Sequence, residues 1–204
     1  MHTRSSTLEL ILAAAEEEFL QKGYTAASLR DIARRAGVTT GALYGYFKNK
    51  QELFGALVGT EYRHTLDLYD AILARFHALP LPEQMARMPE YTNEGMRQIA
   101  EYLYAHWNAF KLILCCSEGT DYTHLVEEMA ARDVQATDDF SQCSQEAGVP
   151  LRPVNATLER MLTYSMFSTF FEMVRQDLPR EETDQYIHQL LEFYIGGWSK
   201  LWGC

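Results

Sequence analysis

The sequence predicts an all-α protein in which a small N-terminal helical domain precedes a larger helical domain. Apolar residues recur at the three- and four-residue spacing of helices along most of the 204 residues. No stretch alternates apolar and polar residues as a half-buried strand does. Prolines and glycines interrupt the helical pattern at a few places, and these interruptions divide the chain into successive helices.

The first expected helix follows Ser6. Ser6 with Glu9 three residues later is typical of a capping box, and Lys22-Gly23 is typical of a helix end. We interpret the acidic run Glu16–Glu18 as a solvated face. The apolar face of this helix comprises Leu8, Ile11, Leu12, Ala15 and Phe19.

Two short amphipathic segments then flank a tight turn. Ser28 can cap the first and Thr39 the second, because each hydroxyl can accept from backbone N–H groups that lack a partner inside the helix. Gly37 suits the left-handed position between them. The pattern predicts a helix-turn-helix, whose apolar positions are Leu29, Ile32, Ala33, Ala36, Leu43 and Phe47.

From Ile32 to Leu53 the chain reads I-A-x-x-A-G-V-[ST]-x-G-x-L-Y-x-[YH]-F-x-x-K-x-x-L. This run resembles the DNA-binding signature of the tetracycline-repressor (TetR/AcrR) family of bacterial transcriptional regulators. The resemblance implies a ligand-responsive regulator, most often a repressor, that binds a palindromic operator in double-stranded DNA as a homodimer. It also implies that a small apolar or amphipathic effector releases the regulator from its operator. Beyond the first quarter of the chain, the length and the helical pattern alone agree with the family.

The second helix of the motif has few large side chains on the side that would face DNA. Leu43 and Phe47 define its buried side, and helical geometry places Gly41, Tyr44 and Gly45 opposite. Because the two glycines offer no side chain to a base edge, direct reading falls to Thr40, Ala42, Tyr44 and Tyr46. We expect this helix to be mobile without DNA.

The resemblance adds further contacts. It assigns phosphate contacts to Tyr44 and Lys50, contacts at the neighbouring helix start to Ser28 and Arg30, and contacts at the recognition-helix start to Thr40 and Gly41. A minor-groove contact or a solvated tail remains open for Arg4. A helix-turn-helix used only for packing is the alternative. The candidate DNA-binding set is Ser28, Arg30, Thr39, Thr40, Gly41, Ala42, Tyr44, Tyr46, Lys48 and Lys50.

The charge distribution is uneven. Net charge is −10, yet residues 1–50 hold seven basic and five acidic side chains against 11 basic and 23 acidic in the remainder. Basic charge therefore gathers where phosphate contact would require it, while an acidic body resists non-specific adhesion to DNA. We predict a helix-turn-helix DNA-binding domain over residues 1–50 and an all-helical ligand-binding and dimerisation domain over residues 51–204.

Asn49, with Glu52 at the third position, can cap a long helix that continues nearly to Pro80. At 1.5 Å per residue it would be on the order of 40 Å long, so it could link the two domains mechanically. The three prolines of residues 79–94 predict a loop or short irregular helix. Further helices are expected at about 94–117, 121–147, 154–177 and 179–201.

The last two helices should be antiparallel neighbours, because a single proline at 179 joins them. Gly196 and Gly197 cost a helix about 1 kcal/mol each relative to alanine, which close approach of another backbone would offset. The resemblance assigns these helices to a dimer interface; the alternative is a frayed C-terminal helix. The candidate interface set is Met161, Ser165, Thr169, Phe193, Gly197 and Leu201.

Aromatic residues of two later helices could line an apolar effector pocket, or could equally be plain core. Trp107 is the foremost candidate, whereas a histidine such as His64 on an apolar helix side is more often a core residue than a ligand contact. The candidate ligand-binding set is His64, Tyr104, Trp107, Phe110, Met166 and Phe170.

Other functional classes find little support in the sequence. No window approaches the roughly 20 apolar residues of a membrane span and the N-terminus lacks the apolar core of a signal peptide, so we expect a cytoplasmic protein without a membrane partner. Cys115, Cys116, Cys143 and Cys204 have no zinc spacing and are interpreted as reduced thiols. We expect no metal, no cofactor and no catalytic residues. A helical interaction module or a cryptic enzyme without DNA binding remains the alternative.

Overall fold

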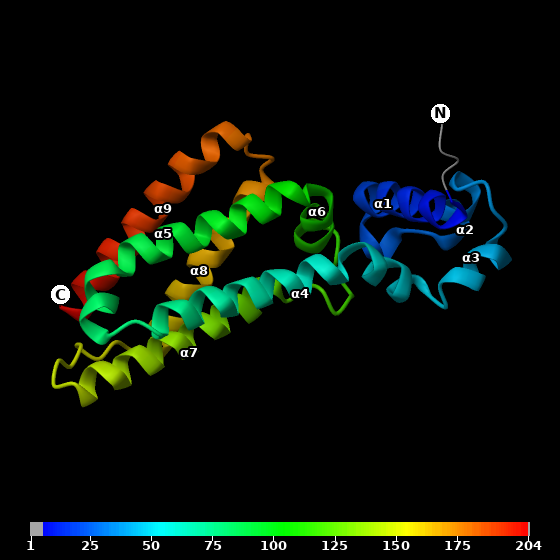
Figure 1. Ribbon diagram of the computed structural model, residues 1–204. Coiled ribbons are helices and arrows are strands. Elements are labelled where there is room, and N and C mark those ends of the chain that lie inside the picture. Colours follow the sequence, from blue (N-terminus) through cyan, green and yellow to red (C-terminus); the bar gives the residue numbers. More distant parts are fainter. Residues whose placement is uncertain (1–5, 204) are drawn as a thin grey trace. The chain divides into compact units, whose positions relative to one another are not determined.

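The computed structural model describes residues 6–203, so Arg4 and Cys204 lie outside the described residues. Every regular element in that range is a helix, which confirms the predicted fold class (Figure 1). The helices of the described range are α1 (Thr7–Ala26), α2 (Leu29–Arg35), α3 (Thr40–Tyr46), α4 (Lys50–His77), α5 (Leu81–Ala105), α6 (Trp107–Cys115), α7 (Leu125–Glu146), α8 (Ala156–Arg175) and α9 (Arg180–Trp202).

The helices form two compact units. The first contains the chain up to His64 together with His106–His124, and the second contains Thr65–Ala105 together with the chain from Leu125 onward. This division differs from the boundary at residue 50 suggested by the sequence. The first half of α4 belongs to the first unit because Leu53, Phe54 and Val58 of that helix are fully buried there.

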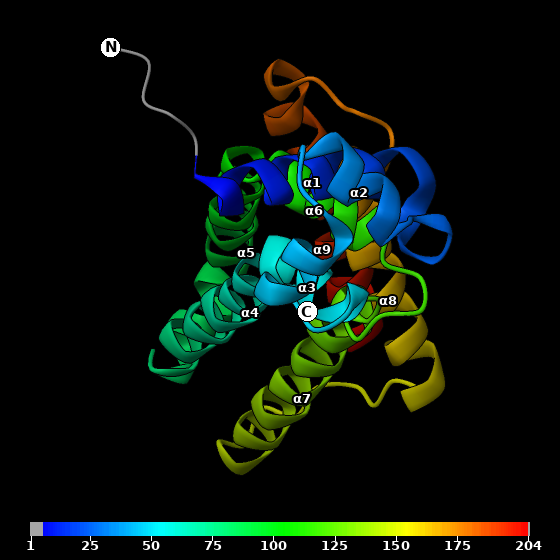
Figure 2. The same cartoon turned by 90° about the vertical axis from the view of Figure 1, so that its right-hand side faces the viewer.

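An aromatic cluster holds the first unit together. The ring of Phe54 packs edge-on against Phe19 and Tyr24 of α1, with centroid separations of 5.0 Å and 5.4 Å. Helix α1 packs against both α2 and α6, and α2 packs against α3. Figure 2 shows α1, α2 and α3 in blue, with α3 leading into α4. The core of this unit therefore joins three short helices to the start of a long one.

The predicted capping box of α1 is present. The Glu9 amide donates to Ser6 Oγ at 3.2 Å, and the Ser6 amide donates to Glu9 Oε2 at 2.8 Å. The predicted end at Lys22-Gly23 is instead a kink, because Gly23 has φ 72° inside α1 and the helix continues to Ala26. Glycine accepts this left-handed conformation without steric cost.

Helix α4 spans 28 residues, as the predicted long helix requires. The predicted cap is also present, since the Glu52 amide donates to Asn49 Oδ1 at 2.8 Å. The rise of 1.5 Å per residue gives α4 a length of about 42 Å.

The segment expected to be a loop or a short irregular helix is part of a long regular helix. Helix α5 begins at Leu81 and passes through Pro89. Pro82 lies in its first turn, where a missing N–H costs nothing, and Pro89 removes one intrahelical bond. Buried Gln84 donates from Nε2 to the carbonyl oxygens of Leu79 at 2.7 Å and His77 at 3.3 Å. This side chain ties the start of α5 to the end of α4.

Two other helix boundaries differ from the sequence prediction. The helix expected over residues 94–117 breaks at His106, whose φ of −126° and ψ of 37° separate α5 from α6. Helix α7 begins at Leu125, several residues after the predicted start near residue 121. Asp121 accepts a hydrogen bond from Gln51 instead. Both differences occur where the chain passes from one unit to the other.

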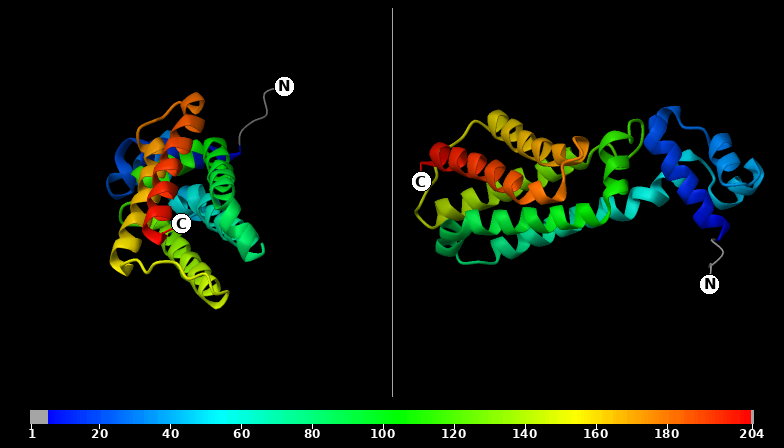
Figure 3. Two further views of the ribbon diagram at one scale, coloured as in Figure 1. Left: turned by 90° about the vertical axis from the view of Figure 1, so that its left-hand side faces the viewer. Right: turned by 90° about the horizontal axis from the view of Figure 1, so that it is seen from above.

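In the second unit α7 packs on α8, α5 packs on α9, and α8 and α9 are neighbours as predicted (Figure 3). Its core contains Met96, Ile99, Met129, Phe167 and Leu191, each at most 2% exposed. Within the described range, none of the helices is long and apolar enough to cross a membrane.

Candidate functional site

The helix-turn-helix is built by local hydrogen bonds. Ser28 Oγ accepts from the Asp31 amide at 3.4 Å at the start of α2, and Thr39 Oγ1 accepts from the Ala42 amide at 3.1 Å at the start of α3. Gly37 turns the chain between them with φ 69°. These are the caps and the turn that the sequence predicted, so the motif is specified within a short stretch of chain.

Helix α3 has one buried side and one open side. Leu43 is fully buried and Phe47 is 8% exposed, whereas Tyr44 and Tyr46 are 51% and 47% exposed. The predicted division of this helix is therefore confirmed. Gly41, Ala42 and Gly45 are also exposed, and Thr40 is half-buried. The open side therefore exposes two phenol groups among residues that have small side chains or none.

The helix-turn-helix and the residues next to it also expose basic side chains. Arg30 near the start of α2 and Lys48 just after α3 are exposed. Arg34 is also exposed, and its Nη2 atom donates to Asp31 Oδ1 at 3.0 Å. Arg30 and Lys48 both belong to the predicted DNA-binding set, and their exposure leaves both cations accessible to phosphate groups.

The structure gives Lys50 a different environment from the phosphate contact that the resemblance implied. Its Nζ atom donates to the carbonyl oxygens of Tyr24 at 2.6 Å, Thr25 at 3.1 Å and Ala27 at 3.1 Å. An ammonium group has three donors, and all three are used here. Burial lowers the pKa of Lys50. The side chain caps the C-terminal end of α1, where carbonyls lack helical partners and the helix dipole favours a cation.

Glu18 is a buried carboxylate, which corrects the interpretation of Glu16–Glu18 as a solvated face. Its side chain is fully buried, while Glu16 is half-buried and Glu17 is exposed. Glu18 Oε1 accepts from Lys22 Nζ at 2.6 Å and from the Ser28 amide at 3.3 Å. Its Oε2 lies 3.6 Å from Arg35 Nε. One carboxylate thus ties α1 to both ends of α2.

The segment between α6 and α7, residues 116–124, is hydrogen-bonded to the end of α1 and the start of α4 within the first unit. The Tyr24 amide donates to the Cys116 carbonyl at 2.8 Å, and Thr25 Oγ1 donates to the Glu118 carbonyl at 3.1 Å. Gln51 Nε2 donates to Asp121 Oδ2 at 3.0 Å. These bonds join the end of α1 and the start of α4 to a segment far along the chain.

Tyr122 of this segment packs on α4. Its ring lies 5.5 Å from that of Tyr62 and 6.1 Å from that of Phe54. A Cβ atom at Gly55 would lie 2.7 Å from the Tyr122 hydroxyl oxygen, so glycine permits this close approach. The sequence analysis did not predict this segment, because its contacts are made with residues far away along the chain.

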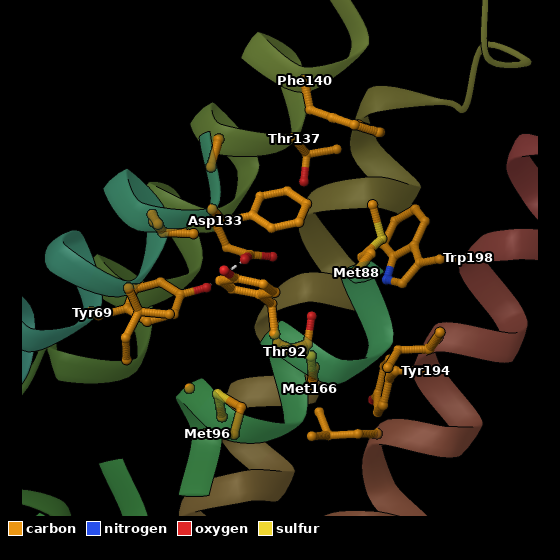
Figure 4. A pocket seen from close by; sticks show the side chains of 18 of the residues that line it. Tyr69, Met88, Thr92, Met96, Asp133, Thr137, Phe140, Met166, Tyr194 and Trp198 are labelled. Atoms are coloured by element: carbon orange, nitrogen blue, oxygen red, sulfur yellow. Dashed lines mark hydrogen bonds between the residues drawn. The ribbon is translucent and has the colours of Figure 1, made fainter. Parts of the chain in front are cut away.

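The second unit contains a cavity of about 130 Å³. It is lined by residues of α4, α5, α7, α8 and α9 (Figure 4). The lining is mainly apolar and aromatic, and the polar groups are few, as in small-molecule sites. The lining residues are Tyr69, Ile72, Leu73, Phe76, His77, Met88, Tyr91, Thr92, Gly95, Met96, Asp133, Ala136, Thr137, Phe140, Met166, Leu191, Tyr194, Ile195, Trp198 and Trp202.

Tyr69 and Asp133 form a polar pair in this cavity. The Tyr69 hydroxyl donates to Asp133 Oδ1, as the dashed line in Figure 4 marks. Burial raises the pKa of the Tyr69 phenol well above its ordinary value, and the nearby Asp133 adds to the shift. Burial also raises the pKa of Asp133, against the opposing effect of the hydrogen bond from Tyr69. The carboxylate is therefore held in an environment that disfavours its charge.

One residue of the predicted ligand-binding set, Met166, lines this cavity, and the other five do not. Phe110 is fully buried in the first unit, which also contains Trp107 and exposed His64. Tyr104 donates from its hydroxyl to the Leu178 carbonyl at 2.8 Å, and Phe170 is fully buried against Phe171. Most of the lining residues could not be chosen from sequence, because five separate helices contribute them.

The predicted dimer set is largely at the surface of α8 and α9. Phe193 is 76% exposed and Met161 is 65% exposed. Ser165, Gly197 and Leu201 are exposed, and Thr169 is half-buried. A Cβ atom at Gly196 or Gly197 would meet nothing within 4 Å, so no neighbour in this chain offsets the cost of these glycines.

In the described part of the chain, the cysteines form no disulfide and no metal site is found. Cys115, Cys116 and Cys143 are free thiols, as expected, and burial raises the pKa of Cys116. Among residues 6–203, no group of three His, Cys, Asp or Glu side chains could hold a metal ion.

Comparisons with known proteins agree with this description. Residues 11–57 match the family described as bacterial regulatory proteins, tetR family. The HTH-type transcriptional repressor BepR of Brucella suis biovar 1 is 44% identical over 55 residues, which cover 27% of this chain and 26% of BepR. The match thus spans about a quarter of that relative's length.

Two further comparisons extend over nearly the whole chain. The uncharacterized HTH-type transcriptional regulator YhgD of Bacillus subtilis is 25% identical over 192 residues, which cover 92% of this chain and 93% of YhgD. The crystal structure of the TetR family transcriptional regulator PfmR from Thermus thermophilus has a TM-score of 0.59 at 18% identity and covers 91% of this chain and 97% of PfmR. The structural likeness shows that the fold is shared.

Proposed function

We propose that this chain, whose residues 11–57 match the tetR family of bacterial regulatory proteins, is a ligand-responsive transcriptional regulator and specifically a repressor. It binds a palindromic operator as a homodimer and leaves it when a small effector enters the second unit. BepR is named a transcriptional repressor and YhgD a transcriptional regulator, which supports this class over an enzyme. The protein acts in the cytoplasm, where its DNA target lies.

The open side of α3 carries this proposal. Tyr44 and Tyr46 project from a helix whose opposite side is anchored by Leu43 and Phe47, so the helix can enter a major groove without losing its core. Exposed Arg30 and Lys48 supply phosphate contacts on either side. Lys50 contributes by fixing the end of α1 rather than by touching DNA.

Dimerisation through α8 and α9 fits the exposed apolar residues of these helices. Two copies would bury Phe193 and Met161, which water contacts in the single protomer. Gly196 and Gly197 would admit the partner's backbone at close range, which accounts for glycines in the interior of α9. The two recognition helices of the dimer would then be spaced about one DNA turn apart, about 34–36 Å.

Helix α4 supplies the connection between effector and DNA. Its first half packs within the first unit, and Tyr69, Ile72 and Phe76 of its second half line the cavity. An effector that binds more tightly to one orientation of α4 would shift the population toward that orientation. The bonds from residues 116–124 to Tyr24, Thr25 and Gln51 would transmit such a shift to the helix-turn-helix.

Nuclease footprinting on DNA from upstream of the protein's own gene tests the proposal. The expected footprint covers a palindrome whose two halves lie one helical turn apart, and it requires the dimer. Absence of protection on any upstream fragment at low salt would favour the alternative of a helical interaction module without DNA binding.

A further inference from the structure

The cavity of the second unit has an aromatic wall. Trp198 and Trp202 stack with their ring centroids 5.2 Å apart, and Trp202 lies 6.4 Å from Phe140. Phe76 continues this wall, 6.2 Å from Phe140 and 6.0 Å from Tyr91. Figure 4 shows Phe140, Tyr194 and Trp198 around the same space. Aromatic faces carry the negative end of the ring quadrupole, so a positive charge in the cavity would be attracted to any of these faces that it meets.

Asp133 contributes a carboxylate to this wall. It is the single acidic residue among the lining side chains, and His77 is the single basic one, since none of them is a lysine or an arginine. The Tyr69 hydroxyl satisfies one of its oxygens. A carboxylate that is partly removed from water is more stable beside a cation than without one. A positive group that entered the cavity would therefore stabilise the ionised form of Asp133.

The three classes of effector differ sharply in this setting. A neutral apolar molecule would displace water from the carboxylate of Asp133 without offering a hydrogen bond or a charge in its place. An anionic amphiphile would place like charge against it. An organic cation gains both the Coulomb attraction of Asp133 and the cation–π attraction of the aromatic wall.

The size of the cavity limits the group that enters. An apolar protein cavity of about 150 Å³ holds one benzene molecule. At about 130 Å³ and partly open, this cavity suits a substituted ammonium group that carries at most one aromatic ring rather than a long acyl chain. We infer that the effector is a small organic cation whose alkylammonium or aromatic-ammonium group lies between Trp198 and Asp133.

This inference rests on the proposed function in one respect, namely that the cavity is the effector site. Binding can nevertheless be measured on the full-length protein without DNA. Suitable probes are phenyltrimethylammonium, its uncharged isostere tert-butylbenzene, and the anion octanoate. Fluorescence of Trp198 and Trp202 reports occupancy, since both indoles line the cavity.

The wild-type protein should bind phenyltrimethylammonium at least about tenfold more tightly than tert-butylbenzene. Equal binding of the two, or tighter binding of octanoate, would overturn the inference. This comparison needs no variant, so its outcome does not depend on whether a substitution is tolerated.

Two variants test whether Asp133 causes the preference for the cationic probe. Asp133→Asn keeps the shape and an oxygen that accepts from Tyr69, and it should reduce the preference for the cation to about threefold or less. Thr137→Lys, one helical turn from Asp133 on α7 and also in the lining, supplies an internal ammonium and should abolish binding of the added cation. Cation selectivity retained in both variants would contradict the assignment.

Asp139→Asn is the matched control, because Asp139 is an exposed acid on the same helix and outside the lining. It should leave the selectivity unchanged, which excludes a general effect of net charge; a loss equal to that of Asp133→Asn would overturn the inference. Operator binding, measured separately without probes, distinguishes the two proposals. Selective cation binding without operator binding would defeat the proposed function alone, and operator binding without cation selectivity would defeat this inference alone.

Discussion

Lys50 Nζ donates to the carbonyl oxygen of Tyr24 at 2.6 Å and lies 4.5 Å from the centre of the Tyr24 ring. The contact joins the first residue of the long helix α4 to the end of α1. Since Tyr24 also bonds to Cys116 through its amide, one residue links α1, α4 and the segment before α7. The lysine of the family signature therefore has a structural reason to be present in this chain.

Replacing Lys50 by methionine should destabilise the first unit. Three carbonyls at the end of α1 would lose their donor, and we expect a loss of roughly 1–3 kcal/mol in the free energy of unfolding. Lys48→Met is the matched control: it should weaken DNA binding and flatten its salt dependence while leaving stability nearly unchanged. Denaturant unfolding and DNA titration of both variants check this. Equal stability of the two variants would contradict the structural role of Lys50.

Gly45→Ala should stabilise the free protein and weaken its binding to DNA. A Cβ atom at position 45 meets nothing within 4 Å, so α3 should gain up to about 1 kcal/mol of helical preference. The same methyl group would stand between the helix backbone and the groove floor. Hydrogen exchange at residues 40–47 measures the first effect, and a DNA titration measures the second. Amides there already protected to the global limit in the wild-type protein would refute a mobile recognition helix.

The helix-turn-helix was predictable because its determinants are local. Thr39, Gly37 and Leu43 lie within a few residues of the contacts they make, so caps, turn and buried face follow from spacing alone. The role of Lys50 was not predictable in the same way, because its partners lie more than 20 residues away and are backbone atoms. Glu18 was misread because an acidic run gives no sign of which carboxylate faces Ser28 and Arg35.

The second unit was harder to predict for a related reason. The prolines of α5 were interpreted as helix breakers, yet Pro82 lies in the first turn and Gln84 supplies the contacts that hold the segment. The cavity takes residues from five helices, and its acidic partner Asp133 lies on a helix without aromatic periodicity. Helical spacing predicts which side of a helix is buried, but not which buried sides leave a space between them.

Asp133→Asn should raise the free energy of unfolding near neutral pH. Burial raises the pKa of Asp133 in the folded protein above its value in the unfolded chain. Below the unfolded pKa, about 3.9, both states are protonated and the carboxylate costs nothing. As pH rises through the folded pKa, the folded state must ionise at a cost, so wild-type stability falls relative to the variant. Urea unfolding at several pH values measures this difference. The prediction would be contradicted if the stability of the variant relative to wild type were lower at pH 7 than at pH 4.

Phe193→Arg should convert the dimer to a folded monomer. The Phe193 side chain is 76% exposed in the protomer, so its loss should leave protomer stability nearly unchanged, while two guanidinium groups would repel across a two-fold interface. Val149→Arg, at another exposed apolar position, should leave the dimer intact. Sedimentation velocity distinguishes the species. A dimeric Phe193→Arg protein, or a monomeric wild-type protein, would rule out this interface.

Titration of labelled upstream DNA with the wild-type protein and a Tyr44→Ala variant tests the central claim most directly. Tyr44 is 51% exposed and supports no core contact, so the variant should fold normally. The account predicts that wild-type affinity falls steeply as salt rises and that Tyr44→Ala weakens binding at every salt concentration. Wild-type protein that fails to bind at low salt, or a variant that binds as tightly as wild type, would contradict the claim that α3 reads DNA.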